Sequence, residues 1–284
     1  MIRSSRPGDE AGLKHLWQIA FGDPMETVNH FFSRLYQPGD AMVWTERGEI
    51  ASAIYLLDAG STISKHGKSL STAYAYALAT LPSYRGRGIG AQVTRAAIEE
   101  SFARGFSCNV ICPAAESLFP FYTRLGYTHT IPIVQGEVQR DESQIDNLTY
   151  KIMSTPFSAY FPLRHAQIPP TSTAYPPKFL RYLEESAQSA GGGFVQLDIG
   201  GQRGCAAVEW RDSKLFLREI LPSSIALQGV QALMAHFDAP AAIFRTISGP
   251  MLPPGCASRP FALLAYPGRE NLETGDWYFP FVLD

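Results

Sequence analysis

The segment with the clearest capacity for chemistry is RGRGIG, residues 85–90, which places two arginines and three alternating glycines directly before a helical pattern. Residues without a Cβ let backbone N–H groups close around an anion, and the following helix adds the partial positive charge of its N-terminus. Arg85 and Arg87 supply full charges that pair well with phosphate oxygens. The spacing matches neither a Rossmann fingerprint nor a P-loop. The combination of glycines, helix N-terminus and two arginines fits a diphosphate attached to a longer ligand.

Two motifs together resemble a known superfamily. Arg85-x-x-Gly88-x-Gly90, which follows a strand and opens a helix, resembles the Q/R-x-x-G-x-G/A signature of the GNAT superfamily of acyl-CoA-dependent N-acetyltransferases. FYTRLGY, residues 121–127, is similar to the Y-x-x-x-G-F/Y segment of that superfamily. The resemblance covers about residues 1–150 in element order, and a weaker one links the rest of the chain to relatives with an appended degenerate GNAT-like domain.

The resemblance implies acetyl-CoA as cosubstrate and no metal. In the superfamily the fourth strand carries a bulge and splays from the fifth, so that pantetheine inserts as a pseudo-strand. Its amides would pair with backbone groups near Leu78, Ala79 and Thr80. Backbone amides would hold the pyrophosphate at Arg85, Gly86, Arg87, Gly88, Ile89 and Gly90.

The resemblance also implies a catalytic tyrosine. The acceptor amine would attack the thioester directly, and a general acid near the sulfur would help coenzyme A to leave. Tyr122 matches the family's tyrosine position and is the candidate, although a packing tyrosine on a short amphipathic helix is the alternative. Tyr127 is expected to be structural.

The general base stays open. Many relatives use a glutamate on the fourth strand, but STAYAYALAT, residues 71–80, contains none, and Ala115 stands where an asparagine often precedes the tyrosine. Glu116 lies nearby and is one candidate base. In tandem relatives of the enhanced-intracellular-survival type a C-terminal carboxylate reaches the active site, so Asp284 is a second by analogy. Water is the third.

Four further residues border the expected thioester site. Tyr74 and Tyr76 share one face of the predicted strand and either line the acceptor pocket or pack in the core. Cys108 and Cys112 raise the alternative of covalent, ping-pong catalysis, which lacks a predicted histidine partner. Direct transfer is therefore favoured.

The elements that position these residues predict an α/β fold. The order β-α-α-β-β-β-α-β-α-β indicates a GNAT-like mixed, mostly antiparallel central sheet flanked by helices, plus a smaller C-terminal α/β domain. The predicted strands are 1–5, 41–46, 49–58, 70–81, 106–113 and 129–138, and the predicted helices are 7–23, 25–39, 89–100 and 116–127.

The middle of the chain is rich in proline. Residues 154–178 hold six prolines among serines and threonines, which predicts a linker that sustains neither a helix nor a central strand. It would separate a catalytic domain, 1–153, from a C-terminal domain, 179–284.

The predicted C-terminal domain repeats the order helix, three strands, helix, strand of the first half, with LPSSIA in place of RGRGIG. It is either a diverged repeat that lacks the phosphate loop or a coincidence of topology. Two late strands are predicted, at 261–266 and 277–284.

The amino-acid composition limits which kinds of partner and site are expected for this protein. The 284 residues are 45% hydrophobic and 18% charged, with a net charge of −2, so nothing indicates general attraction to nucleic acid or a membrane surface. We expect no signal peptide or transmembrane run. The four cysteines have no CxxC spacing, which disfavours a metal site or disulfides. We therefore expect free thiols, which are typical of proteins in a reducing cytoplasm.

These patterns predict a cytoplasmic enzyme that transfers an acetyl group from acetyl-CoA to a primary amine of a small molecule or peptide. One alternative is a non-catalytic acyl-CoA sensor or interaction module. Another is an aminoacyl-tRNA-dependent transferase, which the intact glycine motif and a pI near 6.3 disfavour. The acceptor, acyl-chain preference and oligomeric state are not predicted.

Overall fold

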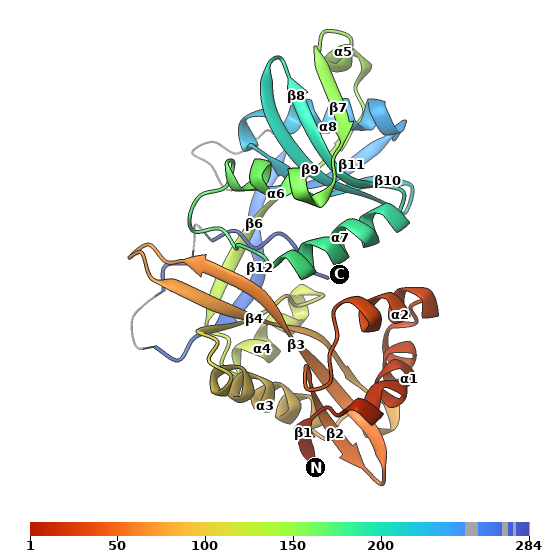
Figure 1. Cartoon of the computed structure of the whole chain (residues 1–284), viewed down its shortest axis with the longest axis vertical. Helices are drawn as coiled ribbons and strands as arrows, with labels where there is room; N and C mark the ends of the chain where they lie inside the picture. The colour runs from red at the N-terminus through yellow and green to blue at the C-terminus, as the bar shows by residue number, and fades with distance from the viewer. Residues whose placement is uncertain (248–254, 269–271, 275–276, 284) are drawn as a thin grey trace.

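A single sheet runs through both halves of the molecule (Figure 1). The computed structural model describes residues 1–247, 255–268, 272–274 and 277–283. The strands are β1 (Ile2–Ser4), β2 (Ala41–Glu46), β3 (Glu49–Ile63), β4 (Ser69–Thr80), β5 (Cys108–Ile111), β6 (His129–Gln139), β7 (Tyr150–Ser154), β8 (Gly193–Ile199), β9 (Gln202–Arg211), β10 (Lys214–Leu221), β11 (Ala241–Thr246) and β12 (Cys256–Ala265). The helices are α1 (Glu10–Phe21), α2 (Met25–Arg34), α3 (Ile89–Ala103), α4 (Phe119–Thr123), α5 (Glu142–Ile145), α6 (Phe157–His165), α7 (Pro177–Ser189) and α8 (Ala226–Phe237).

The described strands lie in the order β1-β2-β3-β4-β5-β12-β6-β11-β10-β9-β8-β7. Among them, only the pairs β4–β5 and β10–β11 are parallel. The predicted mixed, mostly antiparallel α/β fold is therefore confirmed. The predicted strands and helices of residues 1–139 are confirmed within a few residues, apart from β3, which extends five residues further, and α2, which ends five residues earlier.

A strand from the end of the chain joins the two halves. β12 pairs antiparallel with β5, where Leu263 faces Ile111, and with β6, where Leu264 faces His129. β6 in turn pairs antiparallel with β11. Figure 1 shows β6 and β12 running between the lobe of β1–β5 and the lobe of β7–β11. A segment that the sequence assigns to a C-terminal domain thus completes the sheet of the first half.

One local arrangement occurs twice in this sheet. In the first half, β3 pairs antiparallel with β4, which is parallel to β5 after the crossover helix α3. In the second half, β9 pairs antiparallel with β10, which is parallel to β11 after α8. Both β4 and β10 carry an irregularity in their register near the end of the strand. The helix-and-strand order expected for residues 179–247 is therefore present.

The prediction that residues 154–178 sustain no helix is wrong. α6 occupies Phe157–His165 with Pro162 inside it. Tertiary packing outweighs the proline: Tyr160 and Arg164 are buried, Arg164 Nε lies 2.9 Å from Glu219 Oε1, and that oxygen also accepts a hydrogen bond from the Tyr160 hydroxyl at 2.8 Å.

The strand predicted at 277–284 is also wrong for its described part. Within residues 277–283 the only ladder contact is an isolated bridge between Tyr278 and Ser172. Pro280 interrupts any ladder, because proline has no N–H to donate. Phe279, Phe281 and Val282 are nevertheless fully buried. Their apolar character reflects packing between the two halves. The sequence also gave no signal for β7 or α5.

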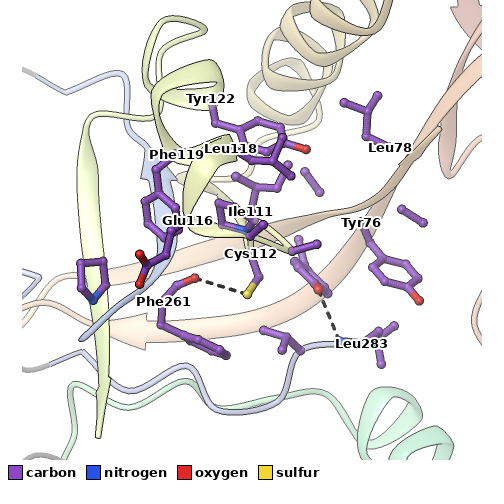
Figure 2. A pocket seen from close by; sticks show the side chains of 18 of the residues that line it. Tyr76, Leu78, Ile111, Cys112, Glu116, Leu118, Phe119, Tyr122, Phe261 and Leu283 are labelled. Atoms are coloured by element: carbon purple, nitrogen blue, oxygen red, sulfur yellow. Dashed lines mark hydrogen bonds between the residues drawn. The ribbon is translucent and has the colours of Figure 1, made fainter. Parts of the chain in front are cut away.

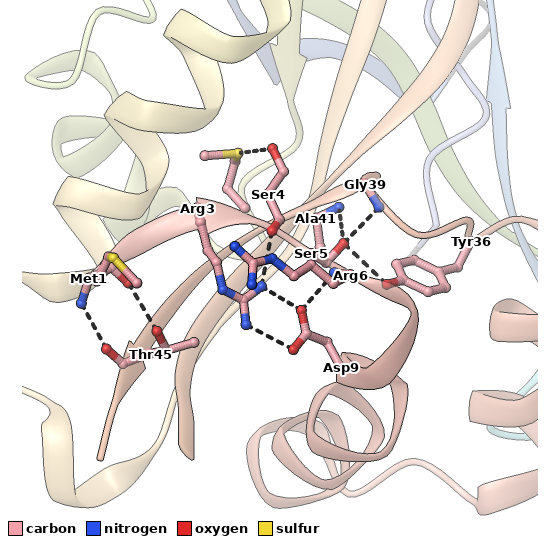
Figure 3. A network of polar contacts seen from close by, with 11 residues as sticks. Met1, Arg3, Ser4, Ser5, Arg6, Asp9, Tyr36, Gly39, Ala41 and Thr45 are labelled. Atoms are coloured by element: carbon pink, nitrogen blue, oxygen red, sulfur yellow. Dashed lines mark hydrogen bonds and ion pairs between the residues drawn. The ribbon is translucent and has the colours of Figure 1, made fainter. Parts of the chain in front are cut away.

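Polar contacts fix the N-terminus against the first helices (Figure 3). Arg3 forms two hydrogen bonds with the carboxylate of Asp9, of 2.6 and 2.9 Å. The Ser5 hydroxyl oxygen accepts hydrogen bonds from the Tyr36 hydroxyl and from the Gly39 backbone N–H, each 3.1 Å long. These contacts anchor both ends of the α1–α2 unit, whose connecting loop borders the site described next.

Candidate functional site

A cavity of about 750 Å³ lies where β4 and β5 end, and both halves of the chain line it. Its walls come from β4, the segment after β5, α4, the end of α1 and the described C-terminal segment. Figure 2 shows Tyr122 and Phe261 on opposite sides of Cys112, with Leu283 and Tyr76 along another wall. Of the predicted cofactor-binding and catalytic residues, Leu78 and Tyr122 line this cavity.

The cavity opens because β4 separates from β5. The two strands pair from Thr72 to Ala75, but β4 continues to Thr80 while β5 ends at Ile111. In the pairing with β3, Ala53 faces Ala79 and Tyr55 faces Tyr76, so two residues of β4 oppose one of β3. Such a bulge bends the strand and increases its twist. The bulge and splay expected from the family resemblance are present.

Ala77 sits in the bulge with a φ of 51°, an unusual value for a residue with a Cβ. Leu78, the other bulged residue, lines the cavity. Ala79 and Thr80 do not; the Ser52 hydroxyl donates to the Ala79 carbonyl at 2.6 Å and lies 2.9 Å from Thr80 Oγ1. These contacts hold the end of β4 against β3, so the edge that faces β5 stays separate.

The segment of residues 85–90, which we call the glycine loop, comprises the last residues before α3 and the first two residues of that helix, and it lies outside the cavity lining. Gly86 and Gly88 have φ values of 76° and 71°, and Gly88 directly precedes α3. A Cβ on either residue would meet no atom within 4 Å. The left-handed backbone, and not crowding, is therefore what requires glycine at these two positions.

The two arginines of the glycine loop have different partners. Arg85 Nε donates to the Thr80 carbonyl at 3.0 Å, which ties the loop to the end of β4. Arg87 Nη2 lies 2.9 Å from Glu46 Oε2, and its guanidinium lies 5.2 Å from the centre of the Tyr84 ring. Arg85 is thus positioned between strand and loop, whereas Arg87 is directed towards β2.

Tyr122 lies on α4 and is nearly buried. In Figure 2 its hydroxyl is directed towards the side on which Leu78 lies. Burial, followed by the neighbouring Cys112, raises the pKa of Tyr122 to about 12. The hydroxyl is therefore protonated at neutral pH and is able to donate a hydrogen bond into the cavity.

Tyr127 has the structural role predicted for it. It is completely buried, and its hydroxyl donates to Asn109 Oδ1 at 2.7 Å. Its ring packs edge-on against Tyr122 with the centroids 6.0 Å apart. Tyr127 therefore supports the helix that carries Tyr122.

Tyr74 and Tyr76 combine the two roles that the sequence left open. Both line the cavity, and their ring centroids are 5.6 Å apart. Tyr74 also packs edge-on against Phe279, and its hydroxyl oxygen accepts a hydrogen bond from the Leu283 N–H at 3.3 Å. The strand face that they share therefore contributes to the core and to the cavity wall.

Two carboxylates line the cavity at different places. Glu116, a predicted base, lies at the start of a short 3-10 helix, beside Phe119 in Figure 2. Asp23 was not predicted; it lies in the α1–α2 loop, where its carboxylate accepts a hydrogen bond from Trp17 Nε1 at 2.8 Å. No motif surrounds Asp23, so only the fold reveals it. The other predicted carboxylate, Asp284, falls outside the described residues, although Leu283 lines the cavity.

The two cysteines near the site differ in access. Cys108 is fully buried, and burial raises its pKa to about 12, which disfavours the thiolate that a nucleophile needs. Cys112 lines the cavity and donates a hydrogen bond from its thiol to the Phe261 carbonyl at 3.3 Å.

The second half contributes residues that the sequence did not connect with the site. Arg245 on β11, and Arg259 and Phe261 on β12, line the same cavity. They lie more than a hundred residues beyond Tyr122 in the chain, and no local motif marks them. The pairing of β12 with β5 and β6 brings them there.

Neither a membrane-spanning helix nor a cluster of metal ligands is found among the described residues. No described helix is long and apolar enough to cross a membrane. Within the same residues, histidine, cysteine, aspartate and glutamate form no group of three or more that could hold a metal ion.

Known proteins match both the first half and the whole fold. Residues 1–130 match the family model described as an acetyltransferase (GNAT) domain. No curated protein sequence matches the chain.

Solved structures match nearly the whole chain. A probable N-acyltransferase from Enterococcus faecalis has a TM-score of 0.66 and 13% identity, covering 94% of this chain and 72% of its own. Eis1 from Mycobacterium abscessus has a TM-score of 0.64 and 14% identity, covering 94% and 73%. A putative acetyltransferase from Pyrococcus horikoshii has a TM-score of 0.55 and 13% identity, covering 98% and 94%. At such identities these matches show a shared fold over both halves.

Proposed function

We propose that this chain, whose residues 1–130 are a GNAT acetyltransferase domain, transfers an acetyl group from acetyl-CoA to a primary amine of a small molecule or peptide. Transfer is direct, within a ternary complex. The observation that carries the proposal is the opening at the bulge of β4, which connects the edge of that strand to a cavity lined by Tyr122.

The residues at this opening suit coenzyme A. Beyond Ala75, β4 has no pairing with β5, so pantetheine amides are proposed to bind its backbone near Leu78, Ala79 and Thr80, where the Ala79 and Thr80 carbonyls also accept hydrogen bonds from Ser52 and Arg85. The glycine loop offers backbone amides and the N-terminus of α3 to a pyrophosphate, as proposed for Arg85 to Gly90. Bound acetyl-CoA would supply a thioester as the acyl donor.

Direct transfer balances without a further reactant. The amine nitrogen forms a bond to the acetyl carbon, the carbon–sulfur bond breaks, and the sulfur leaves with the electron pair. The proton that the amine loses passes to one of the three predicted acceptors: Glu116, the Asp284 carboxylate or water. Glu116 is supported by its place in the cavity lining.

Tyr122 is proposed to act on the leaving sulfur as a hydrogen-bond donor. Its pKa of about 12 lies roughly 3.5 above the ordinary thiol value of about 8.5, so complete proton transfer to a thiolate is unfavourable. A hydrogen bond to the developing charge on sulfur still lowers the barrier, because it stabilises the transition state more than the ground state. The proton that finally neutralises the thiolate then comes from solvent.

The second half is proposed to be a GNAT-like domain without a cofactor site of its own. LPSSIA, residues 221–226, follows β10 at the place where the glycine loop follows β4. In addition, the Thr246 hydroxyl donates to the Ile220 carbonyl at 2.8 Å, which bridges β11 and β10 beyond their last paired residues. The second half therefore serves as a wall of the acceptor cavity.

The test is thiol release from acetyl-CoA with a broad panel of amines, with an amine-free reaction to measure hydrolysis. Saturable turnover with at least one amine, and a fall of about a hundredfold or more in Tyr122→Phe, are the expected results. Saturable acetyl-CoA binding without turnover of any amine would instead favour the sensor. Product formation only from a charged tRNA would favour the aminoacyl transferase.

A further inference from the structure

The side of the cavity formed by Phe261 carries positive charge from the second half. Arg245 and Arg259 both line the cavity, and they lie on β11 and β12, the two strands that flank β6 in the sheet. Both hydrogen-bond to one neutral amide: Gln135 Oε1 accepts from Arg259 Nη2 at 2.6 Å and from Arg245 Nε at 3.4 Å. The two guanidinium groups are thereby held close to each other.

Aromatic rings fix the orientation of Arg245. Its guanidinium lies 4.7 Å from the centre of the Phe216 ring and 4.6 Å from that of Phe261, and its side chain is nearly buried. Stacking on aromatic faces holds a guanidinium in place while its N–H groups stay directed outward in the plane. The Glu209 carboxylate pairs with two other arginines, Arg211 and Arg218.

The acidic and basic side chains that line the cavity come from different parts of the chain. Asp23 belongs to the α1–α2 loop and Glu116 to the segment after β5, whereas both arginines come from β11 and β12. Acidic side chains suit an incoming ammonium group. A pair of guanidinium groups matches an oxyanion, since the planar fork of arginine binds carboxylate and phosphate oxygens in bidentate fashion.

We propose that the acceptor is an amine that also carries an oxyanion, a carboxylate or a phosphate, and that Arg259 and Arg245 bind this group while the amine reaches the thioester beside Tyr122. This rests on the proposed function. Arg259 is the more accessible of the two arginines, because it is exposed whereas Arg245 is buried. It is the specificity-determining residue to test.

The first experiment compares acceptors in matched pairs by thiol release from acetyl-CoA. Amino acids are paired with their amides, and phosphoethanolamine with ethanolamine, so that the two arms separate carboxylate from phosphate. We expect the anionic member of at least one pair to have a kcat/KM at least tenfold higher, as one charge-assisted hydrogen bond would give. Equal kcat/KM within both kinds of pair, in an enzyme that turns over amines, would overturn the inference.

The second experiment uses Arg259→Gln, with Arg203→Gln as control. Arg203 is an exposed arginine of β9 that does not line the cavity. Arg259→Gln should raise the KM of the anionic acceptor about tenfold with little change in kcat, and should leave the neutral partner within about twofold. Arg203→Gln should change neither. An equal loss for both acceptors in Arg259→Gln would refute a role in anion recognition.

Failure of the two proposals is distinguishable. If no amine, charged or neutral, is acetylated by the wild type, the proposed function fails. If amines are acetylated regardless of an anionic group and Arg259→Gln behaves as the wild type, only the inference fails. Thermal denaturation of both variants checks that the fold is retained.

Discussion

At the scale of single residues, two tyrosines of one short motif have opposite roles. Tyr127 is buried and bonded to Asn109, whereas the Tyr122 hydroxyl faces a cavity. The motif FYTRLGY indicated both positions but could not tell a bonded hydroxyl from one available to a substrate. That distinction depends on Asn109, which lies on β5 and reaches Tyr127 only after the strand and α4 have packed.

The matched substitutions Tyr122→Phe and Tyr127→Phe test these roles. Tyr122→Phe should lower kcat about a hundredfold with little change in the melting temperature. Tyr127→Phe should leave kcat within a few-fold but destabilise the protein by about 1–3 kcal/mol, because the buried Asn109 oxygen loses its donor. Steady-state kinetics and denaturant titration measure both. The opposite pattern would mean that the roles are reversed.

The pH dependence of the reaction follows from the pKa of Tyr122. Burial raises it from 10 to about 12, so the hydroxyl keeps its proton throughout the range in which enzymes are assayed. We therefore expect no fall in kcat/KM from Tyr122 ionisation up to about pH 10. The unfolded chain loses this proton first, so this tyrosine destabilises the fold between about pH 10 and 12.

The measurement is a pH–rate profile of the wild type and Tyr122→Phe. An alkaline loss of activity with an apparent pKa near 9, present in the wild type and absent in Tyr122→Phe, would contradict the expectation. An alkaline fall in activity that is the same in the wild type and in Tyr122→Phe would reflect ionisation of the acceptor or of another group.

At the scale of elements, the glycine loop and the bulge of β4 act together. Arg85 bonds to the last carbonyl of β4, so the loop that opens α3 is positioned relative to the bulged strand. The sequence predicted the strand, the loop and the helix because their signals are local. The bulge itself came only from the family resemblance, since STAYAYALAT has no glycine or proline to mark it.

Gly88→Ala tests the loop, and Gly67→Ala is its control. Gly67 lies in the β3–β4 hairpin with a φ of 76°, close to the 71° of Gly88, and a Cβ on either residue would meet no atom within 4 Å. Both variants should therefore lose about 1 kcal/mol of stability through backbone strain. Only Gly88→Ala should also raise the KM for acetyl-CoA, by about tenfold. An equal effect of Gly67→Ala on that KM would exclude a specific role of the loop.

At the scale of the whole molecule, the two halves depend on each other. β12 lies between β5 and β6, and the side chains of β5 are fully buried. A fragment of residues 1–153 would leave two strands without their partner, and an apolar strand edge promotes aggregation. The predicted catalytic domain is therefore not expected to fold alone.

This expectation is tested by expressing residues 1–153 alone and together with residues 154–284. The fragment alone should be insoluble or oligomeric, and coexpression should restore a soluble complex that releases thiol from acetyl-CoA. A soluble, monomeric fragment with a cooperative thermal transition would show that the boundary predicted from the sequence also marks an independent unit.

The sequence by itself determined what local patterns encode. The alternation of strands and helices, the glycine loop and the aromatic motif predicted the first half, its family and the cofactor class. Each of these signals lies within a few residues. Tertiary structure alone decided the insertion of β12, the burial of Arg164 with Glu219 in α6, and the approach of Arg245 and Arg259 to the cavity. These contacts join residues distant along the chain, and packing energy, which outweighs local propensity, is visible only in the folded molecule.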